Sequence, residues 1–370
     1  MSKRGRDRNT AYDSVISQRE QRLKRSQKPI IGIDIGTSSL KMVQMKKNSK
    51  VARWGVEPIP EGMMNQGRIE VSAQIAEVIK KTASKNRIKG NQCSLCLSGN
   101  ELIIRELKLP EMNQNQIMEN IRHEITSFLP LNHEEYCIDY KVLEYIPSQD
   151  DIPGKLRIMV AAIPNNVVNT YIKTLKKANL KVVYVDVVPN IAGKLAKWIM
   201  MNHNMDESFK NIGIIDLGAR TTNIIILKDG NYFIHKTIAN GGDYLTSHIA
   251  DKLNVDFMEA EVFKLKTNFF ENNFQNNACE SVKNYVDYLI TDIERTIEFF
   301  KNRNNQLGVD RIFIMGGGSL LKGLPQYMKE HLYVEVSPLS DVLQQFKRAN
   351  DHTDKVAAFS QAIGATLREE

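Results

Sequence analysis

The sequence predicts an α/β protein with two similar halves facing each other across a cleft, and three stretches lead to this fold class. Residues 30–45 run from a buried strand through Asp34 and a glycine turn into a second apolar strand. Residues 214–227 repeat this order around Asp216, 216 − 34 = 182 positions later. Residues 312–324 form a third strand, glycine turn and helix start. A repeat spaced at about half the chain indicates two duplicated halves.

Hydrophobic periodicity predicts the elements of the first half in order. Strands are expected at 30–35, 40–45, 51–60, 93–97, 101–109, 138–146, 156–163 and 182–188. Helices are expected at 71–84, 113–128, 167–178 and 190–201. Because residues 98–165 contain strands and a helix of their own, we expect them to form a small inserted β/α subdomain.

The second half shows the same mixture of strands and helices. Strands are expected at 214–217, 222–227, 232–238 and 312–315, and helices at 244–253, 257–266, 281–302 and 356–367. The apolar stripe of the helix at 281–302 is expected to face the core. Small residues in the helix at 356–367 would let it cross another helix closely.

The turn after the first strand has the chemistry of a phosphate site. Gly36 allows close approach of the backbone, and the N–H and hydroxyl groups of Thr37, Ser38 and Ser39 can bind phosphate oxygens. Asp34 places a carboxylate where a Mg²⁺ ion on those phosphates would lie. An ordinary hairpin without a ligand could carry the same residues, and the repeat is what favours phosphate.

Length and composition fit two compact halves. At 370 residues the chain exceeds what one hydrophobic core usually serves. No uninterrupted apolar segment approaches the roughly 20 residues that span a membrane. The N-terminus lacks the apolar core of a secretory signal, so we expect a cytoplasmic protein.

The net charge of +7 is concentrated in residues 1–28, where nine basic and three acidic residues give 9 − 3 = +6. This tail has few large apolar residues and is expected to be disordered. Contact with anionic lipid and a solvated tail without a partner both remain open. Nucleic acid is not expected as a partner, because only Tyr12 interleaves with the charges.

The four cysteines are expected to be structural. Cys93 and Cys96 have metal-ligand spacing, but no second pair completes a set of four ligands. They also lie on a predicted strand, where positions three apart point to opposite faces. Cys137 and Cys279 stand alone in the sequence.

Several segments resemble a known superfamily. Residues 34–39 and 216–222 are similar to the two phosphate motifs of the actin-like ATPase superfamily, and 316–324 to its adenosine motif. Residues 189–196 and 357–365 resemble its two connecting helices, which meet at a hinge.

Within that superfamily, residues 107–112, the helix ending at 128–130, and residues 175–186 resemble the PilM family of type IV pilus assembly, in the PilM/FtsA branch. The similarity covers residues 30–368 and implies an actin-like ATPase fold, with two βα halves around a nucleotide cleft and a subdomain inserted in the first half.

The resemblance implies the following domain boundaries. The basic tail, 1–28, precedes a first actin-like domain of 29–97 and 166–205, interrupted by the inserted subdomain 98–165. The second actin-like domain is 206–245 and 300–370, and its helical subdomain is 246–299.

The resemblance also implies ATP and Mg²⁺ as ligands, with Asp34 and Asp216 holding Mg²⁺ through water. The residues it places around the nucleotide lie in glycine turns or on one short helix: Gly36, Thr37, Ser38, Ser39, Gly218, Ala219, Arg220, Thr221, Thr222, Gly241, Gly242, Glu261, Lys264, Gly316, Gly317, Gly318 and Ser319. For Glu261 and Lys264, an exposed ion pair on a helix face is the open alternative.

One position departs from the superfamily pattern. Many members have a glutamate just before the proline of the first connecting helix, where it orients the attacking water. Here that position is Val188, with Asp186 two residues earlier on the expected strand, and Asp186 joins Asp34 and Asp216 as a candidate catalytic residue. Loss of such a base removes a factor of about 10²–10⁴ in rate, so we expect slow or no hydrolysis.

The resemblance implies a place at the cytoplasmic face of the plasma membrane, in pilus assembly and twitching motility. The implied partners are the N-terminal tail of a PilN-like membrane protein and other pilus assembly components. A groove between the first domain and residues 98–165 would bind the tail, with Arg105, Arg122 and the helix at 117–128 as candidates.

Three other functions remain open. An FtsA-like division tether is disfavoured because residues 365–370 form no amphipathic membrane helix. A sugar or acid kinase of the superfamily would need a substrate acid/base constellation that 98–165 does not offer. A scaffold without nucleotide is disfavoured by the two aspartates and three glycine turns.

Overall fold

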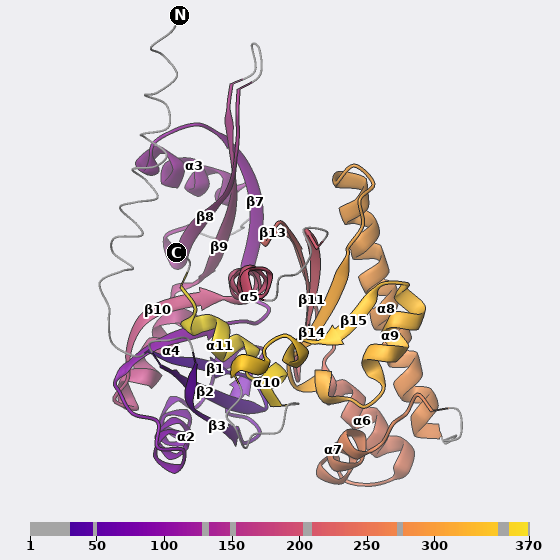
Figure 1. Ribbon diagram of the computed structural model, residues 1–370. Helices are drawn as coiled ribbons and strands as arrows, with labels where there is room; N and C mark the ends of the chain where they lie inside the picture. The colour runs from indigo at the N-terminus through magenta and orange to yellow at the C-terminus, as the bar shows by residue number, and fades with distance from the viewer. Residues whose placement is uncertain are drawn as a thin grey trace, which may run out of the picture. The chain divides into compact units, whose positions relative to one another are not determined.

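The computed structural model describes residues 30–46, 50–127, 133–148, 153–202, 209–271, 277–346 and 355–368 (Figure 1). The predicted basic tail, 1–28, lies outside the described residues. The chain forms two compact units. The small unit is centred on Glu101–Thr170, and the large unit consists of Ile30–Asn100 and Tyr171–Leu367. The finer division into domains and a helical subdomain stays a prediction.

The large unit contains two five-stranded sheets. The first sheet has the order β10-β6-β1-β2-β3, with strands β1 Ile31–Ile35, β2 Ser39–Met45, β3 Val51–Pro58, β6 Gln92–Leu97 and β10 Lys181–Val187. The second has the order β13-β12-β11-β14-β15, with strands β11 Asn211–Leu217, β12 Thr222–Lys228, β13 Asn231–Ile238, β14 Arg311–Met315 and β15 Glu335–Pro338.

The two sheets share one pairing scheme. In the first, β1 pairs antiparallel with β2 and parallel with β6. In the second, β11 pairs antiparallel with β12 and parallel with β14. Asp34 therefore faces Lys41 across its hairpin as Asp216 faces Asn223 across the other. This equivalence confirms the predicted pair of similar halves.

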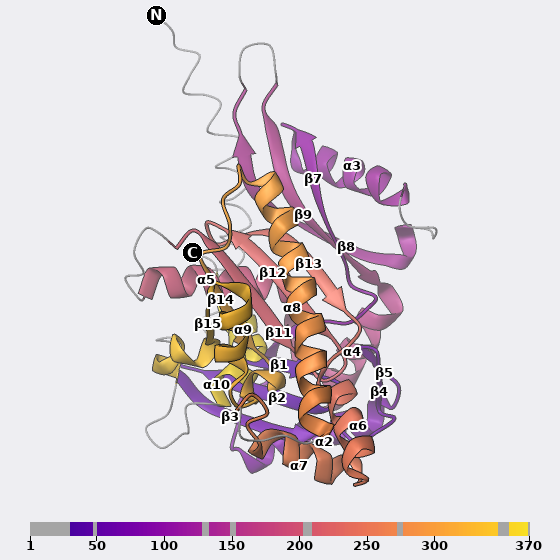
Figure 2. The same ribbon diagram turned by 90° about the vertical axis from the view of Figure 1, so that its right-hand side faces the viewer.

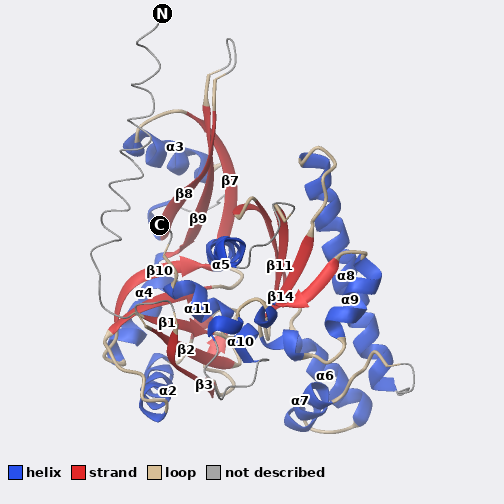
Figure 3. Cartoon of the chain, viewed as in Figure 1, coloured by secondary structure: helices blue, strands red, loops and turns tan. Residues whose placement is uncertain are grey.

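Helices accompany both sheets, and Figure 3 shows the mixed α/β character. The helices associated with the first half are α2 Ser72–Lys85, α4 Asn165–Lys177 and α5 Val188–Asn202, with the short hairpin β4 Met64–Asn65 and β5 Arg68–Ile69. The helices of the second half are α6 Gly242–Leu253, α7 Phe257–Lys266, α8 Asn277–Arg303, α9 Leu324–Leu332, α10 Lys355–Ala358 and α11 Ser360–Thr366. The long α8 runs beside β12 and β13 (Figure 2).

Helices α5 and α11 lie between the two sheets and share one hydrophobic core with both (Figure 1). Small residues allow this packing. A Cβ atom on Gly32 of β1 would overlap the carbonyl oxygen of Ala362, and one on Gly364 would lie 2.5 Å from Ile191 of α5. The expectation that the last helix packs closely against another helix is confirmed.

Two sequence predictions in this region are wrong. The expected helix at 356–367 is two helices, because Phe359 lies between them and its ring stacks on Trp54 at 5.1 Å. Val188 is not on the strand of Asp186, because β10 ends at Val187 and Val188 begins α5, where the buried Pro189 fits the first turn of the helix.

The small unit is an antiparallel sheet with a helix on one face. Its strand order is β7-β9-β8, with β7 Ile103–Pro110, β8 Tyr136–Ile146 and β9 Lys155–Pro164. Asn113 caps helix α3, Gln114–Thr126, in a capping box with Gln116. The buried residues Ile117, Ile121 and Ile125 lie in the core of this unit with residues of the sheet.

Within the described ranges, no helix combines the length and apolar character needed to cross a membrane.

Candidate functional site

The two predicted phosphate turns have the same backbone geometry. The N–H of Gly36 donates to the carbonyl oxygen of Ser39 at 3.1 Å, and the N–H of Gly218 donates to that of Thr221 at 3.0 Å. A Cβ atom on Gly218 would lie 2.8 Å from the Thr221 oxygen, so the turn requires glycine there. Both turns follow directly after a buried aspartate, as the sequence repeat predicts.

The two aspartates have different partners. Asp34 is 5% exposed and forms an ion pair with Lys41, with 3.3 Å between Oδ2 and Nζ. Asp216 is 2% exposed and faces the neutral Asn223, whose Nδ2 donates to Oδ2 at 3.1 Å. A cation thus compensates the first carboxylate, whereas two neutral amides hold the second.

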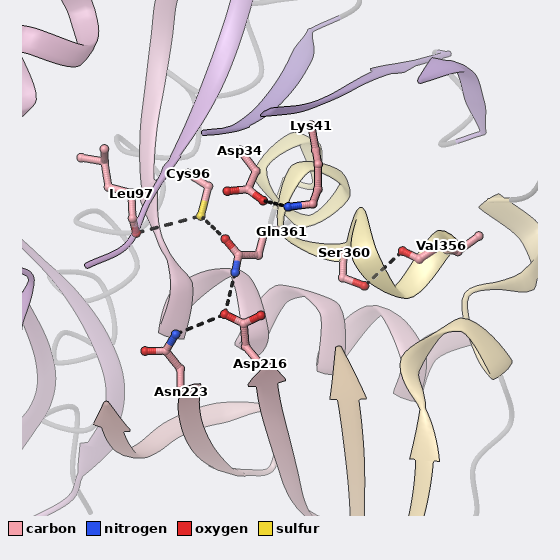
Figure 4. Close-up of polar contacts among 9 residues, drawn as sticks. All are labelled: Asp34, Lys41, Cys96, Leu97, Asp216, Asn223, Val356, Ser360 and Gln361. Carbon is pink, nitrogen blue, oxygen red and sulfur yellow. Dashed lines mark hydrogen bonds and ion pairs between the residues drawn. The ribbon is translucent and has the colours of Figure 1, made fainter. Parts of the chain in front are cut away.

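The second of these amides comes from Gln361 of α11, whose Nε2 donates to Asp216 Oδ2 at 2.6 Å (Figure 4). The other carboxylate oxygen, Oδ1, is buried and has no hydrogen-bond partner among the described residues. Burial, and then the charge of Asp34, raises the pKa of Asp216 to about 6. A buried, uncompensated carboxylate oxygen fits a cation ligand.

The donor set around these aspartates is incomplete without a ligand. Among the described residues, no three His, Cys, Asp or Glu side chains gather as a metal-holding group. Two carboxylates alone do not fill the coordination of Mg²⁺, which keeps waters and takes phosphate oxygens as further ligands. The arrangement fits an ion that arrives with a phosphate compound.

The second phosphate turn is joined to the start of α6. The N–H groups of Gly242 and Asp243 donate to the carbonyl oxygens of Gly218 and Ala219 at 2.9 and 2.8 Å. Arg220 forms an ion pair with Asp243 at 2.9 Å. The hydroxyl of the buried Thr222 donates to the carbonyl of Asn240, and Gly241 packs against the carbonyl of Ala219.

Glu261 and Lys264 do form the i,i+3 ion pair, at 2.6 Å, but this is not an exposed helix face. Lys264 is only 7% exposed, and its Nζ also donates to the hydroxyl of Thr246 at 2.6 Å and to the carbonyl of Gly242 at 3.2 Å. The lysine therefore ties α7 to the start of α6, beside the second phosphate turn.

The third glycine turn lies against the same aspartate. A Cβ atom on Gly316, whose φ is +84°, would lie 2.5 Å from the Leu217 carbonyl and 2.8 Å from Asp216 Oδ1. The N–H of Gly316 donates to Ala357 of α10 at 3.1 Å. The hydroxyl of Ser319 donates back to the carbonyl of Gly316 at 2.7 Å, so it stabilises the turn.

A mainly apolar cleft, partly open to solvent, lies beside this third turn. Gly242, Lys264, Gly317 and Gly318, all predicted to contact nucleotide, line it. The other lining residues are Leu217, Leu245, Leu265, Tyr285, Val286, Leu289, Leu321 and Leu324. An apolar cleft with a few polar groups suits a flat ring with polar edges.

Asp186 lies in a different environment from the other two aspartates. Its Oδ2 forms an ion pair with Lys194 of α5 at 2.6 Å, and its Oδ1 accepts from Asn190 Nδ2 at 2.8 Å. Burial, and after it the charges of Asp34, Asp186 and Asp216, raises the pKa of the Cys96 thiol. Cys96, like Cys93, Cys137 and Cys279, is not part of a disulfide.

Sequence reasoning missed Lys41, Asn223 and Gln361 as site residues. Lys41 and Asn223 each follow their aspartate by seven positions, so the repeat itself contained the signal for them. Gln361 is 145 positions from Asp216, and no spacing in the sequence indicates their contact.

The candidates for a partner site divide into two groups. Ile117, Ile121 and Ile125 are buried in the core of the small unit and present no free apolar face. Arg105 and Arg122 are exposed on that unit. Phe128 lies outside the described residues.

Comparison with known proteins bears on the family and the fold. A family model described as type IV pilus assembly protein PilM matches residues 32–369. A solved PilM–PilN type IV pilus biogenesis complex contains a chain with a TM-score of 0.78 and 23% identity, covering 92% of this chain and 98% of that one. MreB5 of Spiroplasma citri bound to AMPPNP has a TM-score of 0.50 at 12% identity, covering 87% and 94%. These likenesses confirm the predicted actin-like fold.

Curated relatives include the cell division protein FtsA of Bacillus subtilis (strain 168), 20% identical over 256 residues, and that of Buchnera aphidicola subsp. Schizaphis graminum (strain Sg), 22% identical over 267 residues. These matches cover 63% and 66% of this chain, and they span only 57% and 62% of the FtsA proteins.

Proposed function

The chain belongs to the family of the type IV pilus assembly protein PilM, and from this premise we propose that it is an ATP-binding platform of pilus assembly. It binds the N-terminal cytoplasmic tail of a PilN-like inner-membrane protein, at the cytoplasmic face of the membrane, and hydrolyses ATP slowly or not at all. Other pilus assembly components join this complex. The basic tail, 1–28, is a candidate contact for anionic lipid.

The observation that carries nucleotide binding is the buried Asp216 oxygen Oδ1, which has no partner among the described residues and lies beside two glycine turns. Asp34 and Asp216 would hold Mg²⁺, with water between. The turns at Gly36–Ser39 and Gly218–Thr222 would receive the phosphates, and the apolar cleft with Lys264 and Gly317 would receive the base and ribose. When bound, Mg²⁺ supplies positive charge that offsets the phosphate oxygens.

The proposal of slow hydrolysis draws on Asp186 and Val188. The carboxylate of Asp186 is bound by the ammonium of Lys194 and the amide of Asn190, and these two contacts occupy both of its oxygens. Val188 is buried and carries no base. A carboxylate held in this way is a poor general base, because both oxygens are turned toward donors of the protein and not toward an attacking water.

The partner proposal draws on the PilM–PilN complex, because the matched chain of that complex is similar to this chain over most of the length of both chains. Exposed Arg105 and Arg122 are the residues we propose to test first on the small unit. An FtsA-like tether is the second candidate function, since FtsA of Streptococcus pneumoniae serotype 2 (strain D39 / NCTC 7466) is 23% identical over 348 residues, covering 82% of this chain and 74% of FtsA.

Calorimetric titration with ATP and Mg²⁺ tests the nucleotide proposal, with hydrolysis followed on the same samples. Asp34→Ala and Asp216→Ala should each weaken binding at least about tenfold, since each removes a carboxylate that orients the ion. Asp251→Ala, an exposed aspartate on α6, is the control and should bind as wild type does. Binding that both substitutions leave unchanged would refute the site.

A synthetic PilN-like N-terminal peptide tests the partner proposal. We expect Arg105→Ala and Arg122→Ala to weaken its binding in the full chain, with Lys176→Ala on the exposed side of α4 as control. A peptide of the same composition in scrambled order is the comparison ligand. Equal binding of the two peptides would contradict the partner proposal.

A further inference from the structure

Both hydrogen bonds to Asp216 end on the same carboxylate oxygen. Gln361 Nε2 and Asn223 Nδ2 donate to Oδ2, at 2.6 and 3.1 Å, from α11 and β12 (Figure 4). No described donor reaches Oδ1. The two amides therefore fix the carboxylate from one side and leave the other oxygen for a different ligand.

Each of the two amides is oriented by a hydrogen-bond donor that lies at the amide oxygen. The thiol of Cys96 on β6 donates to Gln361 Oε1 at 3.3 Å, whereas its other acceptor, the Leu97 carbonyl, is 4.0 Å away. The hydroxyl of Thr237 on β13 donates to Asn223 Oδ1 at 3.0 Å. An amide whose oxygen accepts from a donor must turn its NH₂ group the other way, here toward Asp216.

The first aspartate has no such arrangement, although its position in the hairpin is equivalent. Lys41, opposite Asp34, brings a positive charge that already offsets that carboxylate. Asp216 is instead held by two neutral amides, which bring no positive charge. Its Oδ1, which has no partner among the described residues, is therefore the oxygen left for an incoming cation.

We propose that Gln361 and Asn223 are positioning residues that hold Asp216 with Oδ1 toward the cation accompanying the nucleotide, and that Cys96 sets the orientation of Gln361. This inference rests on the proposed nucleotide function. It also assigns a role to the buried Cys96, since its thiol connects β6 of the first sheet, through α11, to the aspartate of the second.

The test is the Mg²⁺ concentration that gives half-maximal ATP binding in the full chain, measured beside ATP binding in EDTA and beside the melting temperature. Gln361→Met keeps the size of the side chain but removes both polar ends. It should raise the required Mg²⁺ concentration about tenfold or more, as loss of a residue supporting a metal ligand commonly does, and change binding in EDTA less than about twofold.

Cys96 provides a matched pair of variants. Cys96→Ala removes the donor to Gln361 and should shift the Mg²⁺ requirement in the same direction as Gln361→Met. Cys96→Ser retains an O–H donor at that position and should restore the wild-type requirement. Ser360→Ala is the control on α11, because the Ser360 hydroxyl donates to the carbonyl of Val356 and not to the site.

The outcomes separate this inference from the proposed function. A wild-type chain that binds no ATP at any Mg²⁺ concentration would overturn the proposed function, and this inference with it. A wild-type chain that binds ATP with Mg²⁺, together with a Gln361→Met variant of unchanged Mg²⁺ requirement, would overturn this inference alone. Equal weakening with and without Mg²⁺, or equal behaviour of Cys96→Ala and Cys96→Ser, would assign these residues a merely structural role.

Discussion

Lys194 donates a hydrogen bond to the main-chain carbonyl of Leu367 at 2.9 Å, and this bond fastens α5 to the residue that follows α11. The same ammonium forms the ion pair with Asp186 at the end of β10. The buried ammonium of Lys194 therefore connects α5, the end of α11 and the strand β10, which leads into α5. We expect this contact to stabilise the junction of the two halves.

Replacement of Lys194 by Met should lower the free energy of unfolding by about 3–5 kcal/mol, because it leaves the largely buried Asp186 without its cation. Urea denaturation measures this loss. The double variant Lys194→Met/Asp186→Asn should recover part of it, since no buried charge then remains uncompensated. Equal losses in the single and double variants would contradict the prediction. Lys176→Met, on the exposed side of α4, serves as the control.

Gly32→Ala should destabilise the large unit by about 1–3 kcal/mol or more, because its methyl group would overlap the carbonyl oxygen of Ala362. Both the strand and the helix backbone would have to move to admit it. Chemical denaturation compares this variant with Gly317→Ala, where a Cβ atom would meet no atom within 4 Å. A Gly32→Ala chain as stable as Gly317→Ala would show that α11 is not packed on β1.

Asp216→Asn should make the ligand-free protein more stable at pH 7.5. Burial raises the pKa of Asp216 to about 6 from 3.8, so the folded state binds this proton more tightly than the unfolded state. The charged form thus costs stability above pH 6, at most about 3 kcal/mol, and this cost disappears as the pH falls toward 4. Melting curves at several pH values should show that the gain in stability over wild type shrinks as the pH falls from 6 toward 4. A gain independent of pH would contradict this cause.

The titration of His235 should lower the stability of the protein as the pH falls, which is opposite to the effect of Asp216. Burial lowers its pKa from 6.5 to about 4, so the unfolded state binds the proton first as the pH falls. This costs the wild type stability between pH 6.5 and 4, by up to about 3 kcal/mol. His235→Gln removes that titration. The free energy of unfolding of this variant, relative to wild type, should therefore rise as the pH falls from 6.5 to 4. A constant difference between the two chains from pH 7.5 to 4 would contradict the prediction.

The sequence predicted most of the fold because its signals are local. The alternation and glycine turns around Asp34 and Asp216 placed both hairpins within three residues of the observed strand ends of β1 and β11. The break at Phe359 could not be predicted, because it accompanies stacking on Trp54, 305 positions earlier (359 − 54). The strand β15 was missed, since four residues ending at Pro338 give little alternation.

The candidate site was predicted in part for a similar reason. Its glycine turns and aspartates are contiguous motifs, and Lys41 and Asn223 occupy equivalent places in the repeat. Gln361 reaches Asp216 only because α11 packs on β1 and β6, a tertiary contact without a sequence period. Asp186 was placed near the site, but its ion pair with Lys194, one helical turn beyond Asn190, was not foreseen.

The small unit occupies a single connection between adjacent parallel strands. The chain leaves the large unit at Asn100, after β6, and returns at Tyr171, before β10, and these two strands are hydrogen-bonded neighbours. A crossover between parallel strands tolerates any length above a minimum, because only its ends are fixed by the sheet. Evolution can therefore exchange, enlarge or delete this unit in one step without reordering a strand, and a protein engineer can graft a foreign recognition module at the same two positions.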